Sequence, residues 1–124
     1  MDLFANAPVV SSYSRARAIE DGVLVDVSAI ARFVGFTYPV AFGSAAFAEV
    51  TGFESDAATE EVTAFVRAVL RALHEAIRCS GGDADTILFE VNGRHGGARV
   101  ALKSLVGPGD AGEPVITILF PNED

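Results

Sequence analysis

The chain has little of the chemistry on which metalloproteins, redox proteins and disulfide-stapled proteins depend. Its 124 residues include one cysteine, two histidines, one methionine and no tryptophan. The single cysteine, Cys79, excludes a disulfide within the chain. A metal site would have to be assembled from scattered acids, because histidine and cysteine ligands are so few. The sequence therefore predicts no bound metal and no cofactor.

Long apolar runs are absent as well. No run approaches the ~20 residues that a membrane-spanning helix needs, and no charged segment followed by an apolar one marks the start as a secretory signal. We therefore expect a cytoplasmic protein without membrane association. Half of the residues are apolar and 21% are charged, which is typical of a packed globular chain. Residues 1–124 are expected to form a single domain with one core.

Basic residues are scarce and unevenly distributed. Nine Lys and Arg residues against 17 Asp and Glu residues give a net charge of −8. This charge disfavours direct binding of nucleic acid, which requires clustered Lys and Arg to neutralise phosphates. Residues 1–57 hold seven acids and three bases, residues 58–106 hold six of each, and residues 107–124 hold four acids and no base. The acidity is concentrated toward the two ends of the chain.

Caps and glycines divide the N-terminal half into short elements. Ser14 and Ser28 are typical helix caps, and a glycine follows each of the expected helices. The segment "VLVDV" alternates apolar and polar residues as a strand does. Tyr38 precedes a proline, so "FTYPV" is expected to be extended. The pattern predicts three short helices, over residues 15–20, 29–34 and about 44–51.

One long amphipathic helix is the clearest prediction. It is expected to run from Thr59 to Arg78 and to bury one whole side. Glu60 and Glu61 in its first turn and Arg78 in its last turn favour the helix dipole. The apolar residues that recur at helical spacing are Val62, Phe65, Val66, Val69, Leu70, Leu73 and Ile77.

The C-terminal part of the chain alternates β-rich runs with glycine-rich loops. The runs "TILFEV", "ARVALKSLV" and "VITILF" are separated by "NGRHGG" and "GPGDAGEP", which is the pattern of antiparallel hairpins. The sequence thus predicts an α+β fold. We expect an antiparallel sheet of about three to four strands packed on the long helix, with short N-terminal helices closing one side.

Two longer segments resemble a known family. The stretches "AIEDGVLVDV" and "GPGDAGEPVITI", together with "AIARFVGFTYPVAF", resemble a family of short bacterial proteins catalogued as a domain of unknown function. The resemblance covers both ends of the chain, whereas residues 43–99 match the family only in the arrangement of the expected elements. It implies carriage by plasmids, phages and other mobile elements. No catalytic residue is assigned to the family, so the resemblance transfers none.

Isolated reactive side chains have simple structural explanations. His74 and Glu75 are adjacent on the long helix, but no second histidine follows four residues later, as a zinc-binding helix requires. We expect them on a solvated helix face. Cys79 falls on the last helical turn as a buried or half-buried thiol, and its use as a nucleophile would need His95 beside it.

The loop "NGRHGGAR" is the best sequence candidate for an anion site, because glycines let backbone amides converge and Arg94 and Arg99 flank them. A hairpin turn explains the same residues. The loop lacks the GK[ST] ending and the strand-to-helix transition of a phosphate-binding P-loop.

The stretch "YSRARAIEDGVLVDVS" raises the question of a catalytic carboxylate pair. Glu20 and Asp21 are adjacent, but neighbouring residues of a helix point about 100° apart and do not converge on one atom. We expect Arg15 or Arg17 to pair with one of these acids at helical spacing. The stretch is then part of the architecture, and an enzyme built on it is the alternative.

Three functional hypotheses follow. The first is a non-enzymatic accessory or inhibitor protein of a mobile element that binds a host or competing protein. An anti-CRISPR or anti-restriction protein that presents acidic surface to a nucleic-acid-binding defence complex is one form of it. The second is a dimeric structural or regulatory module for plasmid or phage maintenance. The third is a small enzyme that uses the arginines and acids of the N-terminal signature. The predicted interaction surface comprises Asp110, Glu113, Glu123, Asp124, Glu20, Asp21 and Asp26.

Overall fold

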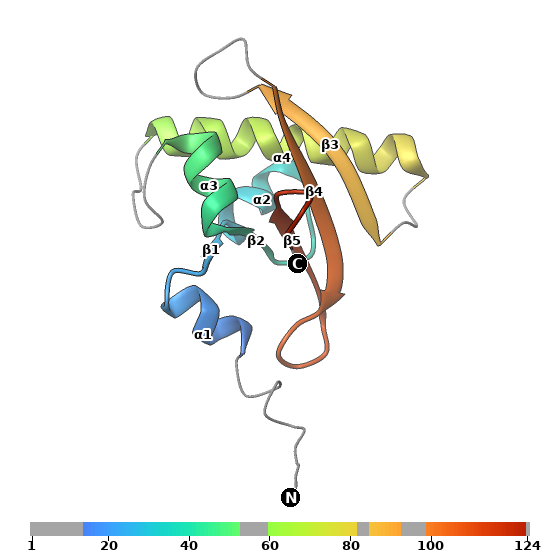
Figure 1. Cartoon of the computed structure of the whole chain (residues 1–124). Helices are drawn as coiled ribbons and strands as arrows, with labels where there is room; N and C mark the ends of the chain where they lie inside the picture. Colours follow the sequence, from blue (N-terminus) through green and yellow to red (C-terminus); the bar gives the residue numbers. More distant parts are fainter. Residues whose placement is uncertain (1–13, 53–59, 82–84, 93–98, 124) are drawn as a thin grey trace, which may run out of the picture.

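A computed structural model describes residues 14–52, 60–81, 85–92 and 99–123. The described part holds helices and strands in a mixed order (Figure 1). In chain order these elements are α1 (Arg15–Glu20), β1 (Leu24–Asp26), α2 (Ser28–Val34), β2 (Val40–Gly43), α3 (Ser44–Thr51), α4 (Glu60–Ser80), β3 (Thr86–Asn92), β4 (Arg99–Pro108) and β5 (Pro114–Leu119). The α+β class that the sequence predicts is confirmed.

The sheet is larger and less regular than expected. Within the described residues it has five strands in the order β1-β2-β5-β4-β3, and β2 pairs with β5 in parallel while the other pairings are antiparallel. The expected antiparallel sheet of three to four strands is therefore corrected to a mixed sheet. All four residues of β2 are buried, so this strand lacks the alternation that marks a strand in the sequence. Its parallel partner β5 lies more than 70 residues later along the chain, where no local spacing could reveal it.

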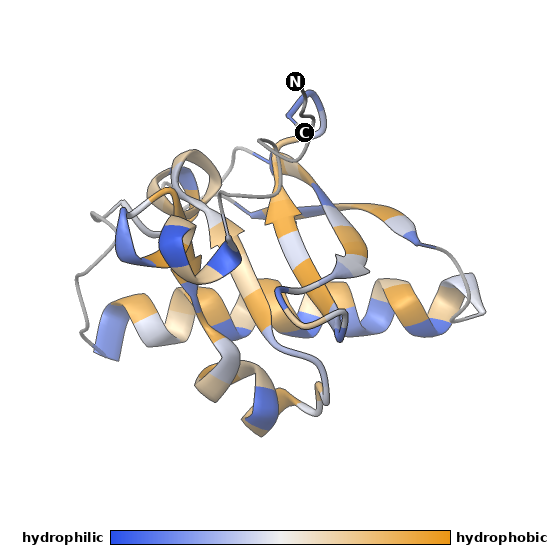
Figure 2. Ribbon diagram, turned by 90° about the horizontal axis from the view of Figure 1, so that it is seen from below, coloured by the Kyte–Doolittle hydropathy of each residue, from blue (hydrophilic) through white to orange (hydrophobic). Residues whose placement is uncertain are grey.

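The long helix forms as predicted and packs on one face of the sheet. Its observed bounds are Glu60 and Ser80, and Thr59 lies outside the described residues. Its buried side chains are Val62, Val66, Val69, Leu70 and Leu73, and Phe65 and Ile77 are half-buried against the core. Along α4, hydrophobic and hydrophilic residues alternate (Figure 2), as expected for a helix that buries one side. No helix in the described ranges is long and apolar enough to cross a bilayer.

The hydrophobic core of the described residues lies between the sheet and the helices α2, α3 and α4. The strands contribute alternate residues to it, because successive side chains point to opposite faces of a sheet. Phe42 packs edge-on against Phe47, with ring centroids 5.9 Å apart, and so ties β2 to α3. The core strand residues are Val25, Val40, Phe42, Ile87, Phe89, Val91, Leu102, Ile116 and Ile118.

Local capping is confirmed at one predicted helix start and corrected at the other. The Ser14 hydroxyl accepts a hydrogen bond from the Arg17 backbone N–H, as an N-cap does. Ser28 is the first residue of α2 instead of its cap, because Asp26 accepts from the Ser28 backbone N–H. The Ser28 hydroxyl is buried, donates to Asp26 and accepts from the Val40 N–H, so it joins α2 to β2.

Candidate functional site

Arg15 connects the first helix to the last strand. Its guanidinium Nη1 donates to Thr117 Oγ1 at 2.8 Å, and Nη2 donates to the Ile116 carbonyl oxygen at 2.9 Å. Thr117 pairs with Ala41 in the sheet and points to the face opposite the core. The half-buried Arg15 side chain therefore lies on the side of the sheet that α4 does not cover.

Asp110 caps the same helix from the loop between β4 and β5. Its two carboxylate oxygens accept from the backbone N–H groups of Arg15 at 2.7 Å and Ala16 at 3.0 Å. The Ser14 hydroxyl satisfies the next N–H group, that of Arg17. The first N–H groups of a helix have no partner within it, and here three successive ones are satisfied. The β4–β5 loop and the start of α1, which are far apart in the sequence, thus meet, and Figure 1 shows the loop beside the helix.

Three carboxylates from separate parts of the chain act electrostatically on the Arg15 guanidinium. Burial lowers the pKa of Arg15 below its ordinary value, whereas the charges of Asp26, Asp110 and Glu113 act in the opposite direction. These acids belong to β1 and to the β4–β5 loop. One guanidinium thus compensates only part of the negative charge around it.

The end of α1 adds two more acids to this region. Glu20, Asp21 and Asp26 line one shallow hollow between the end of α1 and β1, together with Gly22 and Leu24. Gly22 has φ of 81°, a left-handed conformation that lets the chain turn from the helix into the strand. Acids from the start and the end of the sequence therefore gather around α1, and we call Glu20, Asp21, Asp26, Asp110 and Glu113 the α1 acidic patch.

Glu113 has a second role within the patch, and neither Glu123 nor Asp124 is assigned to the patch. Glu113 accepts from the Ala111 backbone N–H at 3.0 Å and so closes the β4–β5 turn. Glu123 is half-buried, and its Oε1 accepts from the Phe120 N–H at 2.9 Å. Asp124 lies outside the described residues. Of the seven acids expected at an interaction surface, five come together around α1.

The sequence did not reveal the hydrogen bonds that join Arg15 to β5, which we call the arginine bridge. Local helical pairing of Arg15 with Glu20 or Asp21 was the expected arrangement, but the structure directs Arg15 to β5 and to the β4–β5 loop. The two partners are about a hundred positions apart, so no spacing rule could find them. The sequence offered only an indirect signal, because the segments "YSRARAIEDGVLVDVS" and "GPGDAGEP" were its most distinctive ones.

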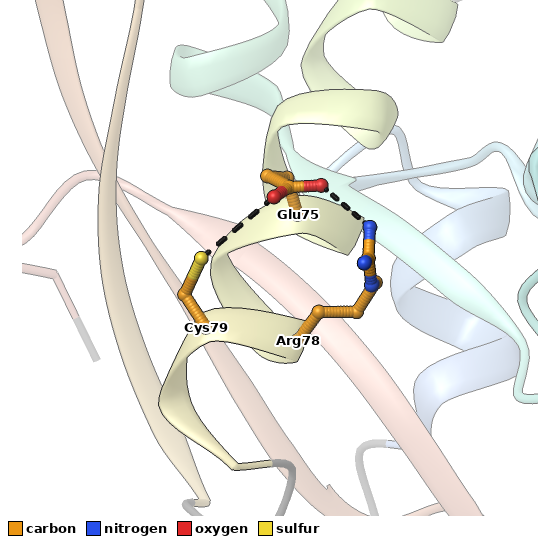
Figure 3. A network of polar contacts seen from close by, with 3 residues as sticks. All are labelled: Glu75, Arg78 and Cys79. Atoms are coloured by element: carbon orange, nitrogen blue, oxygen red, sulfur yellow. Dashed lines mark hydrogen bonds and ion pairs between the residues drawn. The ribbon is translucent and has the colours of Figure 1, made fainter.

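The other reactive side chains are engaged in local packing and ion pairs. His74 is half-buried and packs edge-on against Phe36, with ring centroids 5.6 Å apart, so it is less solvated than expected. Figure 3 shows Glu75 accepting from Arg78 at 2.9 Å and from the exposed Cys79 thiol at 3.7 Å. The expected buried or half-buried position of Cys79 is therefore wrong. His95 lies outside the described residues.

The predicted anion-binding loop falls mostly outside the described residues, and Arg94 is among those not described. Arg99 is described, and its Nε lies 3.2 Å from Glu90 Oε1 across the β3–β4 pair. Within the described ranges, no group of three or more His, Cys, Asp or Glu side chains is arranged to hold a metal ion.

The pKa of Asp110 makes the cap of α1 testable by pH. The N–H groups of Arg15 and Ala16 hold this pKa below its usual value of 3.8, with a smaller contribution from the Arg15 charge. A carboxyl whose pKa is lower in the folded state stabilises the fold above the unfolded pKa and loses that contribution as the pH falls through the folded pKa.

We expect the stability advantage of the parent protein over Asp110→Asn to shrink as the pH falls from about 6 to about 3. Asparagine keeps one acceptor oxygen but does not titrate in this range. Urea unfolding of both proteins across this range measures the difference. A difference that is independent of pH would show that the charged cap contributes nothing to folding.

Comparisons with protein-family models, with curated proteins and with solved structures find no match. The α1 acidic patch offers exposed carboxylates whose positions are set by backbone hydrogen bonds at Asp26, Asp110 and Glu113. Such an arrangement suits recognition of positively charged groups.

Proposed function

We propose that this protein is a non-enzymatic accessory or inhibitor protein of a mobile genetic element. It acts in the cytoplasm by binding a host or competing protein through the α1 acidic patch. The partner is a protein with a basic surface, such as the nucleic-acid-binding groove of a defence complex, and the activity is of the anti-CRISPR or anti-restriction type. The observation that carries the proposal is the convergence of acids from both ends of the chain on one helix.

The patch is suited to binding because its charges are held in place before any partner arrives. Asp110 is fixed by two backbone N–H groups, Glu113 by one, and Asp26 by the N–H and hydroxyl of Ser28. A surface that is already ordered loses less conformational entropy on association. All five acids are also exposed, so a basic groove can reach them.

Electrostatic recognition predicts both an effect on rate and a dependence on salt. A negative patch that faces a positive groove accelerates encounter at low ionic strength. The Debye screening length falls to about 8 Å at ~0.15 M salt, so association should slow as the salt concentration rises further. A partner held by apolar contacts would show little of this dependence.

We expect the triple variant Glu20→Gln, Asp110→Asn and Glu113→Gln to lose partner binding while it keeps the fold. These substitutions remove three charges and keep an amide oxygen at each position. Host pull-down with mass spectrometry, followed by a CRISPR-interference plating assay, measures binding and inhibition. Circular dichroism establishes that the variant is folded.

The matched control removes three charges elsewhere, through Glu49→Gln, Glu60→Gln and Glu61→Gln. These residues are exposed on α3 and at the start of α4, outside the α1 acidic patch. We expect the control to bind as the parent does. Equal recovery of the partner with both triple variants would show that the α1 acidic patch has no special role, and an equal loss with both would mean that only net charge matters.

A further inference from the structure

Strand β3 forms one edge of the sheet. It is last in the strand order, and among the described residues only β4 pairs with it. Figure 1 shows β3 on the outside of the sheet, over α4. The edge is seven residues long, from Thr86 to Asn92. By contrast β1, at the opposite edge, has three residues.

The register shows which backbone groups of β3 face outward. The Val106 N–H donates to the Asp85 carbonyl at 2.9 Å, and these two residues are opposite each other in the register that pairs Thr86 with Leu105. Hydrogen-bonded pairs alternate along an antiparallel ladder. Odd-numbered residues of β3 therefore bond to β4, and the N–H and C=O groups of Thr86, Leu88 and Glu90 point away from the sheet.

This edge has few of the devices that prevent pairing with another strand. Natural edge strands are protected by charged side chains, proline, bulges or shortness. The sequence "TILFEVN" is seven residues long and has no proline and no lysine, and its one charged residue, Glu90, forms an ion pair with Arg99 of β4. Leu88, which precedes the central residue Phe89, is 69% exposed. A hydrophobic side chain thus coincides with backbone groups that no other strand of the described residues pairs with.

The balance of charge around β3 favours a second copy of this chain as its pairing partner. The helix α4 and the strands β3 and β4 come almost entirely from residues 58–106, where six acids balance six bases. The surplus acids of the chain belong to the segments outside this range, including the α1 acidic patch. Two copies of a protein with a net charge of −8 repel each other least where their local charge is balanced.

We propose that the β3 edge pairs with the β3 edge of a second copy of this chain, antiparallel about a two-fold axis, to form one continuous sheet across a homodimer. Leu88 lies at the axis opposite the partner's Leu88, and Thr86 lies opposite the partner's Glu90. This register buries both exposed leucines and keeps the two Glu90 side chains apart. The association closes at two copies because the short β1 edge offers little to pair with.

Cross-linking tests the register. In a background of Cys79→Ser, the variant Leu88→Cys places two thiols on residues whose Cα atoms are about 5.5 Å apart, within the range of a disulfide. The control Thr86→Cys places them about 14 Å apart, four residues at about 3.4 Å each. We expect mild oxidation to link Leu88→Cys into a covalent dimer and to leave Thr86→Cys monomeric on a denaturing gel. Equal cross-linking of both variants would overturn the proposal.

Mass measurement tests the dimer without new cysteines. Sedimentation equilibrium of the parent should give twice the chain mass of 12.9 kDa at micromolar concentration. Leu88→Lys removes the buried leucine contact and puts two like charges face to face at the axis, so it should weaken the dimer by at least about tenfold. Ala101→Lys makes the same change one strand inward, on the same face, and should leave the dimer intact. A parent mass of 12.9 kDa at every concentration, or equal dimerisation of Leu88→Lys, would overturn the proposal.

Discussion

Replacing Leu73 by aspartate is expected to unfold the protein. Leu73 is fully buried on the face of α4 that packs against the core. Aspartate there would leave an unpaired carboxylate among apolar side chains and a cavity where the leucine was. The cost is several kcal/mol, comparable with the whole stability of a domain of this size, about 5–15 kcal/mol. Circular dichroism melts of the variant should show no cooperative transition.

The neighbouring residue His74 is the control for this prediction. His74→Ala should remain folded, because this side chain is half-buried at the margin of the helix interface. Its edge-on contact with Phe36 suggests a loss of about 0.5–1.5 kcal/mol and a lower melting midpoint. If both variants kept the parent midpoint, the assignment of the buried face of α4 would be wrong.

Replacing Arg15 by methionine is expected to give the second largest effect. The substitution removes two side-chain hydrogen bonds to β5 and a positive charge that interacts with Asp26, Asp110 and Glu113. Hydrogen bonds from a charged group contribute about 1.5–3 kcal/mol each when shielded, and solvent screening lowers this for a half-exposed side chain. We expect a loss of about 2 kcal/mol in the free energy of unfolding.

Added salt separates the two causes of this loss, which are the missing hydrogen bonds to β5 and the repulsion among the carboxylates. Without the guanidinium, Asp26, Asp110 and Glu113 repel one another, so added salt should restore part of the lost stability. Denaturant unfolding at low and high salt measures this recovery. Arg17→Met, at an exposed position of the same helix, should change stability by less than about 0.5 kcal/mol. Equal losses for both arginines would mean that the bridge to β5 does not stabilise the fold.

Local patterns in the sequence were sufficient for several elements. The 3.6-residue periodicity of α4 identified its buried side, because a helix that packs on a sheet must bury one stripe. Ser14 was correctly expected to cap α1, since capping joins atoms only three residues apart. The β3–β4 and β4–β5 hairpins also followed from strand runs and short loops.

Contacts between distant segments could not be predicted in the same way. The parallel pairing of β2 with β5 joins segments separated by two helices and two strands, and β2 is too uniformly buried to show an alternating pattern. The shift of the α2 start arose because Asp26 competes with Ser28 for the capping role.

The sequence by itself determined the class of fold, the long helix and the surplus of acids at the two ends of the chain. Only the tertiary structure decided that these ends meet. Asp110 reaches the start of α1 because β4 and β5 carry their connecting loop to that end of the sheet. Arg15 turns to Thr117 because the helix lies beside the last strand. The physical reason is that charge and periodicity are local properties of a sequence, whereas the position of a carboxylate relative to a helix start depends on strand order and register.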